Sequence, residues 1–137
     1  PKPVYHTQSL DFATEDEGEF YRCMTGVIRK RWKRLDSEGG AGAALEKLQM
    51  FMRLRQLSLH PQVYIAGRKK ALGKLYARPD WEGSSTKFEA IKKLVAGGGN
   101  WIVFCHFHRE MEMLQELLLL SIPFVQDQML QLLPLHK

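Results

Sequence analysis

The sequence predicts a mainly α fold with a small β-sheet, in which a helical part is followed by a strand–helix (βα) unit. Three observations predict it. Apolar residues recur at helical spacing from Thr14 to Leu59, a pattern typical of amphipathic helices. Trp101 to Cys105 is an unbroken apolar run directly after three glycines, typical of a strand buried on both faces of a parallel sheet. Met111 to Leu118 then carries an apolar stripe of helical period, which favours a helix packed on that sheet.

Size and composition set the class of protein. The 137 residues suffice for one domain with a core, and 45% hydrophobic with 26% charged residues is typical of a globular protein. The net charge of +5 permits an anionic partner, with nucleic acid the commonest, and could equally serve solubility alone. Two distant cysteines predict no disulfide and an intracellular location. We expect no membrane partner, because no apolar run could span a bilayer.

The first elements follow from local signals. We expect a weak strand or an extended segment over residues 1–12. A helix should follow to about Leu35, with Thr14 as its N-cap and Glu17 reaching back to complete a capping box. Acidic residues in its first turns and basic residues at 29–34 complement the helix dipole. The expected buried face consists of Phe20, Met24, Val27, Ile28, Arg31 and Leu35.

The glycine-rich residues 36–42 predict a flexible loop. A second helix should run from Ala43 to about Leu59, and its apolar sides predict that it is buried in the middle of the fold. His60-Pro61 ends it, because the residue before a proline is pushed out of the helical region. Basic residues at 68–70 then lie in what could be a short helix, before a polar connector at 77–84.

The second half of the chain should contain the sheet. A third helix begins with Ser84 or Ser85 as its cap and stops at Gly97. We place the strand at residues 101–106 and its helix at 109–120. A short strand at 122–125 and a last helix at 126–133 follow. The strand's partner is expected in residues 4–12, in 122–125 or in another chain.

Nothing in the sequence predicts catalysis or a metal site. Gly97-Gly98-Gly99 precedes a strand and lacks the Gly-Lys-Ser/Thr ending of a phosphate-binding loop, so we interpret it as a turn. Cys105, His106 and His108 could ligate zinc, but no second ligand pair is visible at a typical spacing. Cys105 and His106 make a poor nucleophile and base, because adjacent strand residues point to opposite faces.

Two basic groups are candidates for contacts to DNA phosphates. His106, His108 and Arg109 follow the apolar strand, at the end of the sheet where ligands bind in open α/β folds and beside helix amides. Arg68, Lys69 and Lys70 form the second group. From their charge alone, both groups could equally well be solvent-exposed surface that binds no DNA.

Three short motifs carry a family resemblance through their order. Residues 54–61 read Leu-Arg-Gln-Leu-Ser-Leu-His-Pro, residues 85–88 read Ser-Thr-Lys-Phe, and residues 100–105 read Asn-Trp-Ile-Val-Phe-Cys. This order resembles the middle of the Swi/Snf-type DNA-dependent ATPases of the superfamily 2 helicases. There, a leucine-arginine helix ending in His-Pro precedes a Ser-x-Lys helix start and the first strand of the second RecA-like lobe. The family-motif residues are Leu54, Arg55, His60, Pro61, Ser85 and Phe104.

The resemblance implies an organisation for residues 4–118. Residues 1–80 would be the helical connector between two motor lobes, and residues 81–137 an incomplete RecA-like second lobe with an apolar tail. The end of its strand would lie near the DNA backbone, and Lys87 joins the tentative DNA contacts. Cys105-His106 replaces the serine-glutamine pair common in the family. The motifs that hold ATP and magnesium in a complete motor are not in this sequence, so we expect no cofactor here.

We therefore predict a fragment or truncated relative of such an ATPase, which is non-catalytic alone and binds duplex DNA, protein partners or both. It would be nuclear or otherwise associated with nucleic acid. The apolar second helix and the leucine-rich tail predict a protein partner or a homo-oligomer. Two alternatives remain open: an excised part of a full DNA translocase or chromatin remodeller, and a stand-alone regulator that docks on such a motor.

Overall fold

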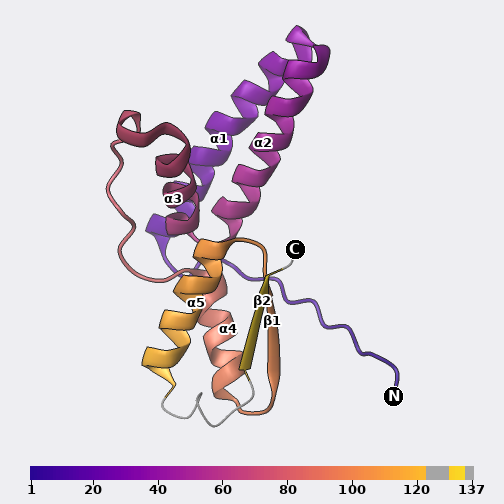
Figure 1. Ribbon diagram of the computed structural model, residues 1–137, viewed down its shortest axis with the longest axis vertical. Helices are drawn as coiled ribbons and strands as arrows, with labels where there is room; N and C mark the ends of the chain where they lie inside the picture. The colour runs from indigo at the N-terminus through magenta and orange to yellow at the C-terminus, as the bar shows by residue number, and fades with distance from the viewer. Residues whose placement is uncertain (123–129, 135–137) are drawn as a thin grey trace.

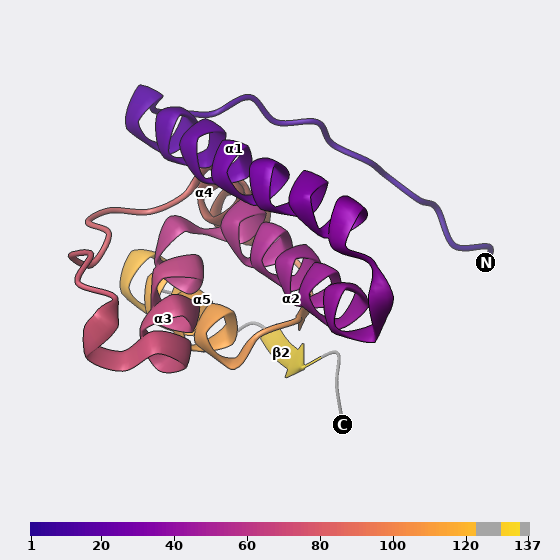
Figure 2. The ribbon, with the colours of Figure 1, turned by 90° about the horizontal axis from the view of Figure 1, so that it is seen from above.

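The protein is mainly helical, as predicted. The computed structural model describes residues 1–122 and 130–134. Figures 1 and 2 show a helical part made of α1 (Glu15–Glu38), α2 (Gly40–Leu59), α3 (Pro61–Leu72) and the 3₁₀ turn η1 (Gly73–Leu75). Below it in Figure 1 lie α4 (Thr86–Ala96), β1 (Trp101–Cys105), α5 (His108–Ser121) and β2 (Leu130–Pro134). Within the described ranges, no helix has the length and apolarity needed to cross a bilayer.

Helices α1 and α2 form a hairpin with almost no loop. The flexible loop predicted at 36–42 is wrong, because α1 extends to Glu38 and α2 begins at Gly40. The backbone φ angles are 66° at Gly39 and 84° at Gly40, in the left-handed region that favours glycine. The glycines therefore allow a tight reversal between two helices and do not form a loose segment.

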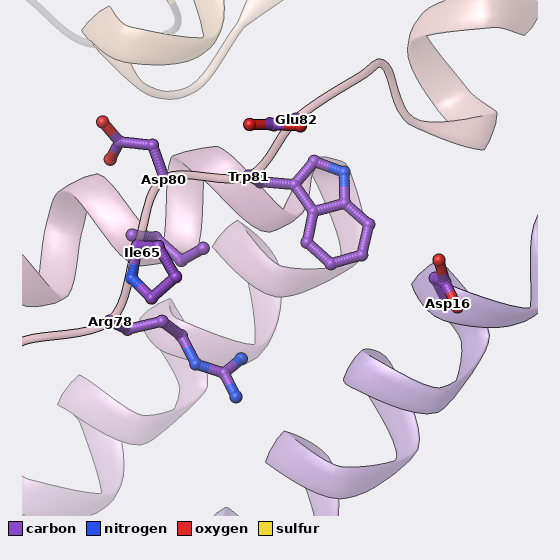
Figure 3. Close-up of a pocket in the computed structure, with 7 residues that line it drawn as sticks. Asp16, Ile65, Arg78, Asp80, Trp81 and Glu82 are labelled. Atoms are coloured by element: carbon purple, nitrogen blue, oxygen red, sulfur yellow. The ribbon is translucent and has the colours of Figure 1, made fainter.

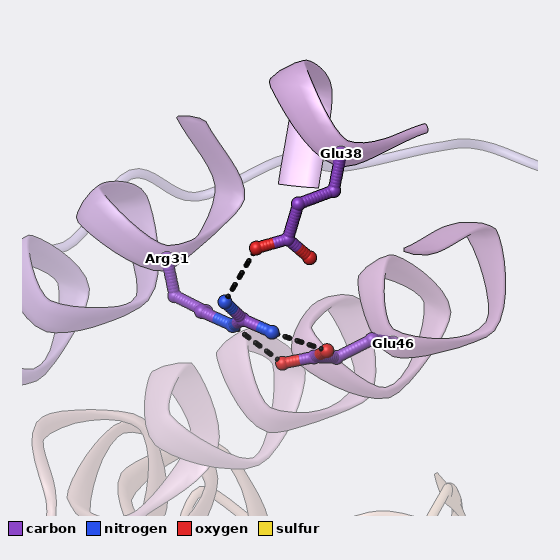
Figure 4. Close-up of polar contacts among 3 residues, drawn as sticks. All are labelled: Arg31, Glu38 and Glu46. Carbon is purple, nitrogen blue, oxygen red and sulfur yellow. Dashed lines mark hydrogen bonds and ion pairs between the residues drawn. The ribbon is translucent and has the colours of Figure 1, made fainter. Parts of the chain in front are cut away.

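A bidentate ion pair ties the hairpin together near this turn. Arg31 Nε donates to Glu46 Oε1 at 2.8 Å, and Arg31 Nη2 donates to Glu46 Oε2 at 2.9 Å (Figure 4). The third contact, from Arg31 Nη1 to Glu38, is 3.1 Å long. The hydrogen bonds to Glu46 raise the pKa of Arg31 above its ordinary value and lower the pKa of Glu46. These contacts use both arms of the guanidinium to fix the register of α1 on α2.

The hairpin packs on α3 through one face of each helix. The buried cluster consists of Phe20, Ile28, Leu35, Ala43, Met50, Leu57, Tyr64 and Ile65. Val27, predicted to be buried, is 59% exposed. The prediction that α2 is buried in the middle of the fold is also wrong, because Leu45, Leu48 and Phe51 are 59%, 60% and 53% exposed. Neighbouring helices cover only the inner side of α2, so its outer apolar residues face solvent.

Strands β1 and β2 are hydrogen-bonded to each other in parallel, and α5 lies between them in the sequence. Trp101 lies opposite Leu130, and Cys105 lies opposite Pro134. A parallel pair needs a crossover, and here α5 supplies it. The partner differs from every predicted segment: residues 1–12 form neither helix nor strand, and 130–134 are strand where a helix was expected. The strand predicted at 122–125 and the first part of that helix fall largely in 123–129, outside the described residues.

Among the residues that the structure describes, helices pack on one face of β1. Val103 and Cys105 pack with Phe88 of α4 and Leu114 of α5. On the opposite face Ile102 and Phe104 are 57% and 59% exposed. The prediction of a strand buried on both faces is therefore wrong, because α4 and α5 lie on the same side of the sheet.

The N-terminus of α4 joins the two parts of the molecule. Ser85 caps α4 as predicted, because its Oγ accepts from Phe88 N at 3.2 Å, and the same hydroxyl donates to Leu59 O at 2.8 Å. Thr14 also caps α1 through the amide of Glu17, at 3.3 Å. The predicted capping box is wrong, however, because the buried Glu17 carboxylate accepts instead from Thr86 N, at 3.0 Å, and from Thr86 Oγ1, at 2.7 Å.

His60 completes this junction. It ends α2, and its Nδ1 accepts from Gln62 N at 2.9 Å to cap α3. Its ring lies 4.7 Å from that of Phe88 and is 1% exposed. A proline at the first helical position has no backbone N–H that needs an acceptor, so Pro61 suits the start of α3. His60-Pro61 therefore ends one helix and begins the next.

Replacing Glu17 with alanine is expected to destabilise the protein by about 1–3 kcal/mol, because two donors of Thr86 would lose their acceptor. The free energy of unfolding from urea denaturation measures this. Glu19→Ala, at an exposed position on the same helix, is the matched control and should have little effect. Equal losses in both variants would contradict a specific role for Glu17.

The buried ring of His60 predicts a loss of stability in acid. Burial lowers the pKa of His60 to about 4 from its ordinary value of 6.5. The unfolded chain therefore binds a proton at higher pH than the folded protein does. The stabilisation is fully present above pH 6.5 and is lost as the pH falls toward 4. We expect the free energy of unfolding to fall by roughly 3 kcal/mol over this interval.

The His60→Asn variant isolates this contribution, because asparagine can also cap α3 but does not titrate. Its urea-derived stability should depend less on pH than that of the wild type. His6→Asn, in the exposed N-terminal segment, should retain the wild-type profile. If His60→Asn keeps the full acid dependence, His60 is not its source.

Candidate nucleic-acid interface

A groove between α3 and the β1–α5 turn brings together residues from both predicted basic groups. It has a volume of about 470 Å³. Its lining includes Lys70 from α3 and His106, His108 and Arg109 from the turn and the start of α5. Four of the seven predicted DNA contacts therefore share one surface, although they come from segments far apart in the sequence.

Close packing of α2 and α3 shapes the floor of this groove. Gln56 and Gly67 line it, and a Cβ atom added to Gly67 would lie 2.8 Å from Gln56 Oε1. A side chain at position 67 would therefore displace the end of the Gln56 side chain, which packs over Gly67 in the floor of the groove.

The β1–α5 turn is fixed from within. Glu110 Oε2 accepts from His106 N at 2.7 Å and from Phe107 N at 3.2 Å. These two amides are occupied, so a phosphate group at this helix N-terminus would have to use other donors. Arg55 Nη2 lies 3.3 Å from His106 Nδ1 and adds a cation at the edge of the turn. Arg109 contacts Glu112 at 3.1 Å, one helical turn along.

The other predicted contacts lie elsewhere. Lys69 forms an ion pair with Asp80 at 2.7 Å, and this hydrogen bond is the main reason that the pKa of Asp80 is lowered. The guanidinium of Arg68 lies over the ring of Tyr76, 5.8 Å from its centroid. Lys87 lines a different hollow beside Phe12 and Thr86. The structure therefore separates these three from the groove.

The family-motif residues also lie in different parts of the structure. Pro61, His60 and Ser85 are buried at the junction described above. Leu54 packs against the helical core, whereas Arg55 reaches His106. Phe104, 59% exposed, lies on the uncovered face of β1.

Cys105 is unsuited to act as a nucleophile. Burial, with the charge of Glu110 as a lesser cause, raises its pKa to about 11. The thiol is then protonated at neutral pH, whereas a thiolate is the reactive form. Over the ranges that the structure describes, histidine, cysteine and acidic side chains do not gather in threes as a metal site requires.

A second hollow lies between the start of α1, α3 and the connector before α4. Its volume is about 360 Å³, and it is lined by Asp16, Ile65, Arg78, Pro79, Asp80, Trp81 and Glu82 (Figure 3). Trp81 N donates to Gln62 Oε1 at 2.6 Å, which holds the connector on α3. The acidic lining makes this hollow a poor site for DNA phosphates.

The sequence predicted Arg55 as a family-motif residue but not as a DNA contact, although the structure places it at the edge of the groove, 3.3 Å from His106. The position of Arg78 beside Phe20, with 4.5 Å between guanidinium and ring centroid, depends on the path of an irregular connector. No local pattern predicts that path.

The resemblance to the Swi/Snf-type ATPases rests on the order of the three motifs and has no independent support. Comparisons with protein-family models, with curated proteins and with solved structures gave no match.

Proposed function

We propose that the chain is the helical connector and first βα unit of a Swi/Snf-type DNA-dependent ATPase, and that alone it binds duplex DNA without hydrolysing ATP. Contact between two of the motifs supports this proposal. Leu59 O accepts from Ser85 Oγ, and the ring of His60 lies against Phe88. A strand–helix–strand unit with parallel strands follows, in agreement with the start of an α/β lobe. Such a protein would be nuclear or otherwise associated with nucleic acid.

The observation that carries the DNA-binding proposal is the shared groove of Lys70, His106, His108 and Arg109. Lysine and arginine supply the phosphate contacts that dominate affinity for DNA. The groove lies at the carboxyl end of β1, where open α/β sheets bind ligands. Arg55 adds positive charge at its edge, and only Glu112 among the residues that line the groove opposes it.

Replacing Lys70 or Arg109 with alanine is expected to weaken binding to a mixed-sequence DNA duplex. Each variant should also reduce the slope of log K against log salt by about 1, because one phosphate contact is lost. Fluorescence anisotropy over a salt titration measures both quantities.

Lys87→Ala is the matched control, because Lys87 has the same charge but lines a different hollow. It should retain the wild-type slope. Wild-type affinity that does not change with salt would contradict phosphate recognition, and an equal effect of Lys87→Ala would place the DNA outside the groove.

A second candidate function is association with another protein or a second copy of the chain. Leu45, Leu48 and Phe51 form an exposed apolar stripe on α2. Exposed apolar patches of this kind commonly mark interfaces. None of these three residues lines the groove, so the two functions are compatible.

Light scattering at micromolar concentration is expected to show a mass above that of the monomer for the wild type. Leu48→Glu should restore the monomer, because a charge would have to be buried in the contact. Leu75→Glu, at an exposed leucine outside the stripe, should leave the mass unchanged. A monomeric wild type that binds no hydrophobic dye would contradict self-association.

A further inference from the structure

The outer side of α2 has the residue spacing of a helix that pairs with a second helix. Leu45 and Leu48 are 59% and 60% exposed, and Ala41 and Met52 extend this side toward the two ends of the helix. The steps between these residues are four, three and four, which is the alternation that places side chains in the contact of two paired helices. Ala41, Leu45, Leu48 and Met52 together form the seam.

The seam lies opposite the buried side of α2. Ala43, Met50 and Leu57 face the helical core and follow one another at intervals of seven residues. Successive helical residues diverge by about 100°, so the seam lies roughly 180° away from these three. Helix α2 therefore carries two apolar sides, and the neighbouring helices among the described residues cover only the inner one.

The charged residues of α2 avoid the seam. Glu46 and Lys47 form ion pairs with α1, on the inner side. Arg53 follows Glu46 by seven residues and so lies on that side as well. Among the charged residues of this fully described helix, Arg55 alone lies on the outer side, at the end of the seam. An exposed helix side is ordinarily polar, so an uncharged one over about three turns indicates a contact with another helix.

We propose that the seam binds the seam of a second copy of the chain, with the two α2 helices antiparallel. The proposal rests on the self-association put forward above and specifies its contact. With the two-fold axis between residues 46 and 47, Leu45 of each copy meets Leu48 of the other, and Ala41 meets Met52. At the flank of the seam, Phe51 meets the alanine at position 44. Small residues thus face large ones at both ends, as close packing requires.

The charges at the ends of the seam favour an antiparallel pair over a parallel one. In a parallel pair, Arg55 would face Arg55 of the other copy, and like charges repel. In the antiparallel pair, Arg55 extends past Ala41 of the other copy toward the turn of its hairpin. Asp36 and Glu38 lie there, with side chains that are 57% and 52% exposed. Figure 1 shows the hairpin projecting beyond α3 at this end, which leaves the turn accessible to a second copy.

Disulfide cross-linking reports the orientation of the two helices. The background is Cys23→Ser, because Cys23 is exposed whereas Cys105 is buried. In the antiparallel register, residue 41 faces residue 52 of the other copy, but each lies about 16 Å along the helix axis from its own equivalent. A disulfide needs Cα atoms within about 7 Å of each other. Ala41→Cys and Met52→Cys, mixed in reductant and then oxidised, should therefore give a cross-linked dimer, and neither variant should give one alone.

The control is a mixture of Ala41→Cys with Leu75→Cys, which carries its cysteine at an exposed position outside α2. The proposal is overturned if Ala41→Cys and Met52→Cys each cross-link with themselves, as a parallel pair requires, or if their mixture cross-links no more than the control. A wild type that is larger than a monomer in light scattering keeps self-association in either case, so the two ideas fail separately. A monomeric wild type overturns both and leaves the seam to a different protein.

Arg55→Glu tests the charge contact at the end of the seam. The dissociation constant of the dimer, measured by analytical ultracentrifugation, should rise about tenfold, because two attractions per dimer are replaced by two repulsions. Arg29→Glu makes the same change in charge at an exposed position of α1 and should leave the constant unchanged. Equal effects of the two variants would overturn the antiparallel register, because net charge alone would then explain them.

Discussion

The carboxylate of Glu17 and the hydroxyl of Ser85 hold the N-terminus of α4 against the helical part, and the rest of the structure depends on these contacts. Glu17 accepts both donors of Thr86, and Ser85 connects Leu59 O to Phe88 N. Buried polar groups are costly when unpaired, so this network allows little change in how the two parts meet. It places the β1–α5 turn beside α3 and thereby forms the groove.

Local signals predicted most helix ends but not the packing of the helices. The caps at Thr14 and Ser85 and the stop at His60-Pro61 were predictable because each involves residues three or fewer positions apart. The partner of Glu17 was not, because Thr86 is 69 residues away and competes successfully with the local capping box. The exposure of Val27 and of the outer side of α2 likewise depends on which neighbours are present, and periodicity alone does not contain that information.

The sequence predicted the candidate site as two separate basic groups, and it did not predict that residues of both would line one groove. His106, His108 and Arg109 are close in sequence, but Lys70 comes from α3, and its place beside them depends on packing between segments far apart in the chain. Part of the division among Arg68, Lys69 and Lys70 was predictable. Successive helical residues diverge by about 100°, so three consecutive cations cannot all face one groove. The ion pair between Lys69 and Asp80 depended again on the path of the connector.

The uncovered face of β1 has a thermodynamic consequence for any partner. Ile102 and Phe104 are more than half exposed, and covering apolar side chains of this kind lowers the heat capacity of the system. Phosphate contacts made by lysine and arginine instead release bound salt ions and bury little apolar surface. Calorimetry of binding at several temperatures and salt concentrations would therefore show which surface a partner uses. A large negative heat-capacity change with weak salt dependence indicates the apolar faces. A small heat-capacity change with strong salt dependence indicates the basic ones.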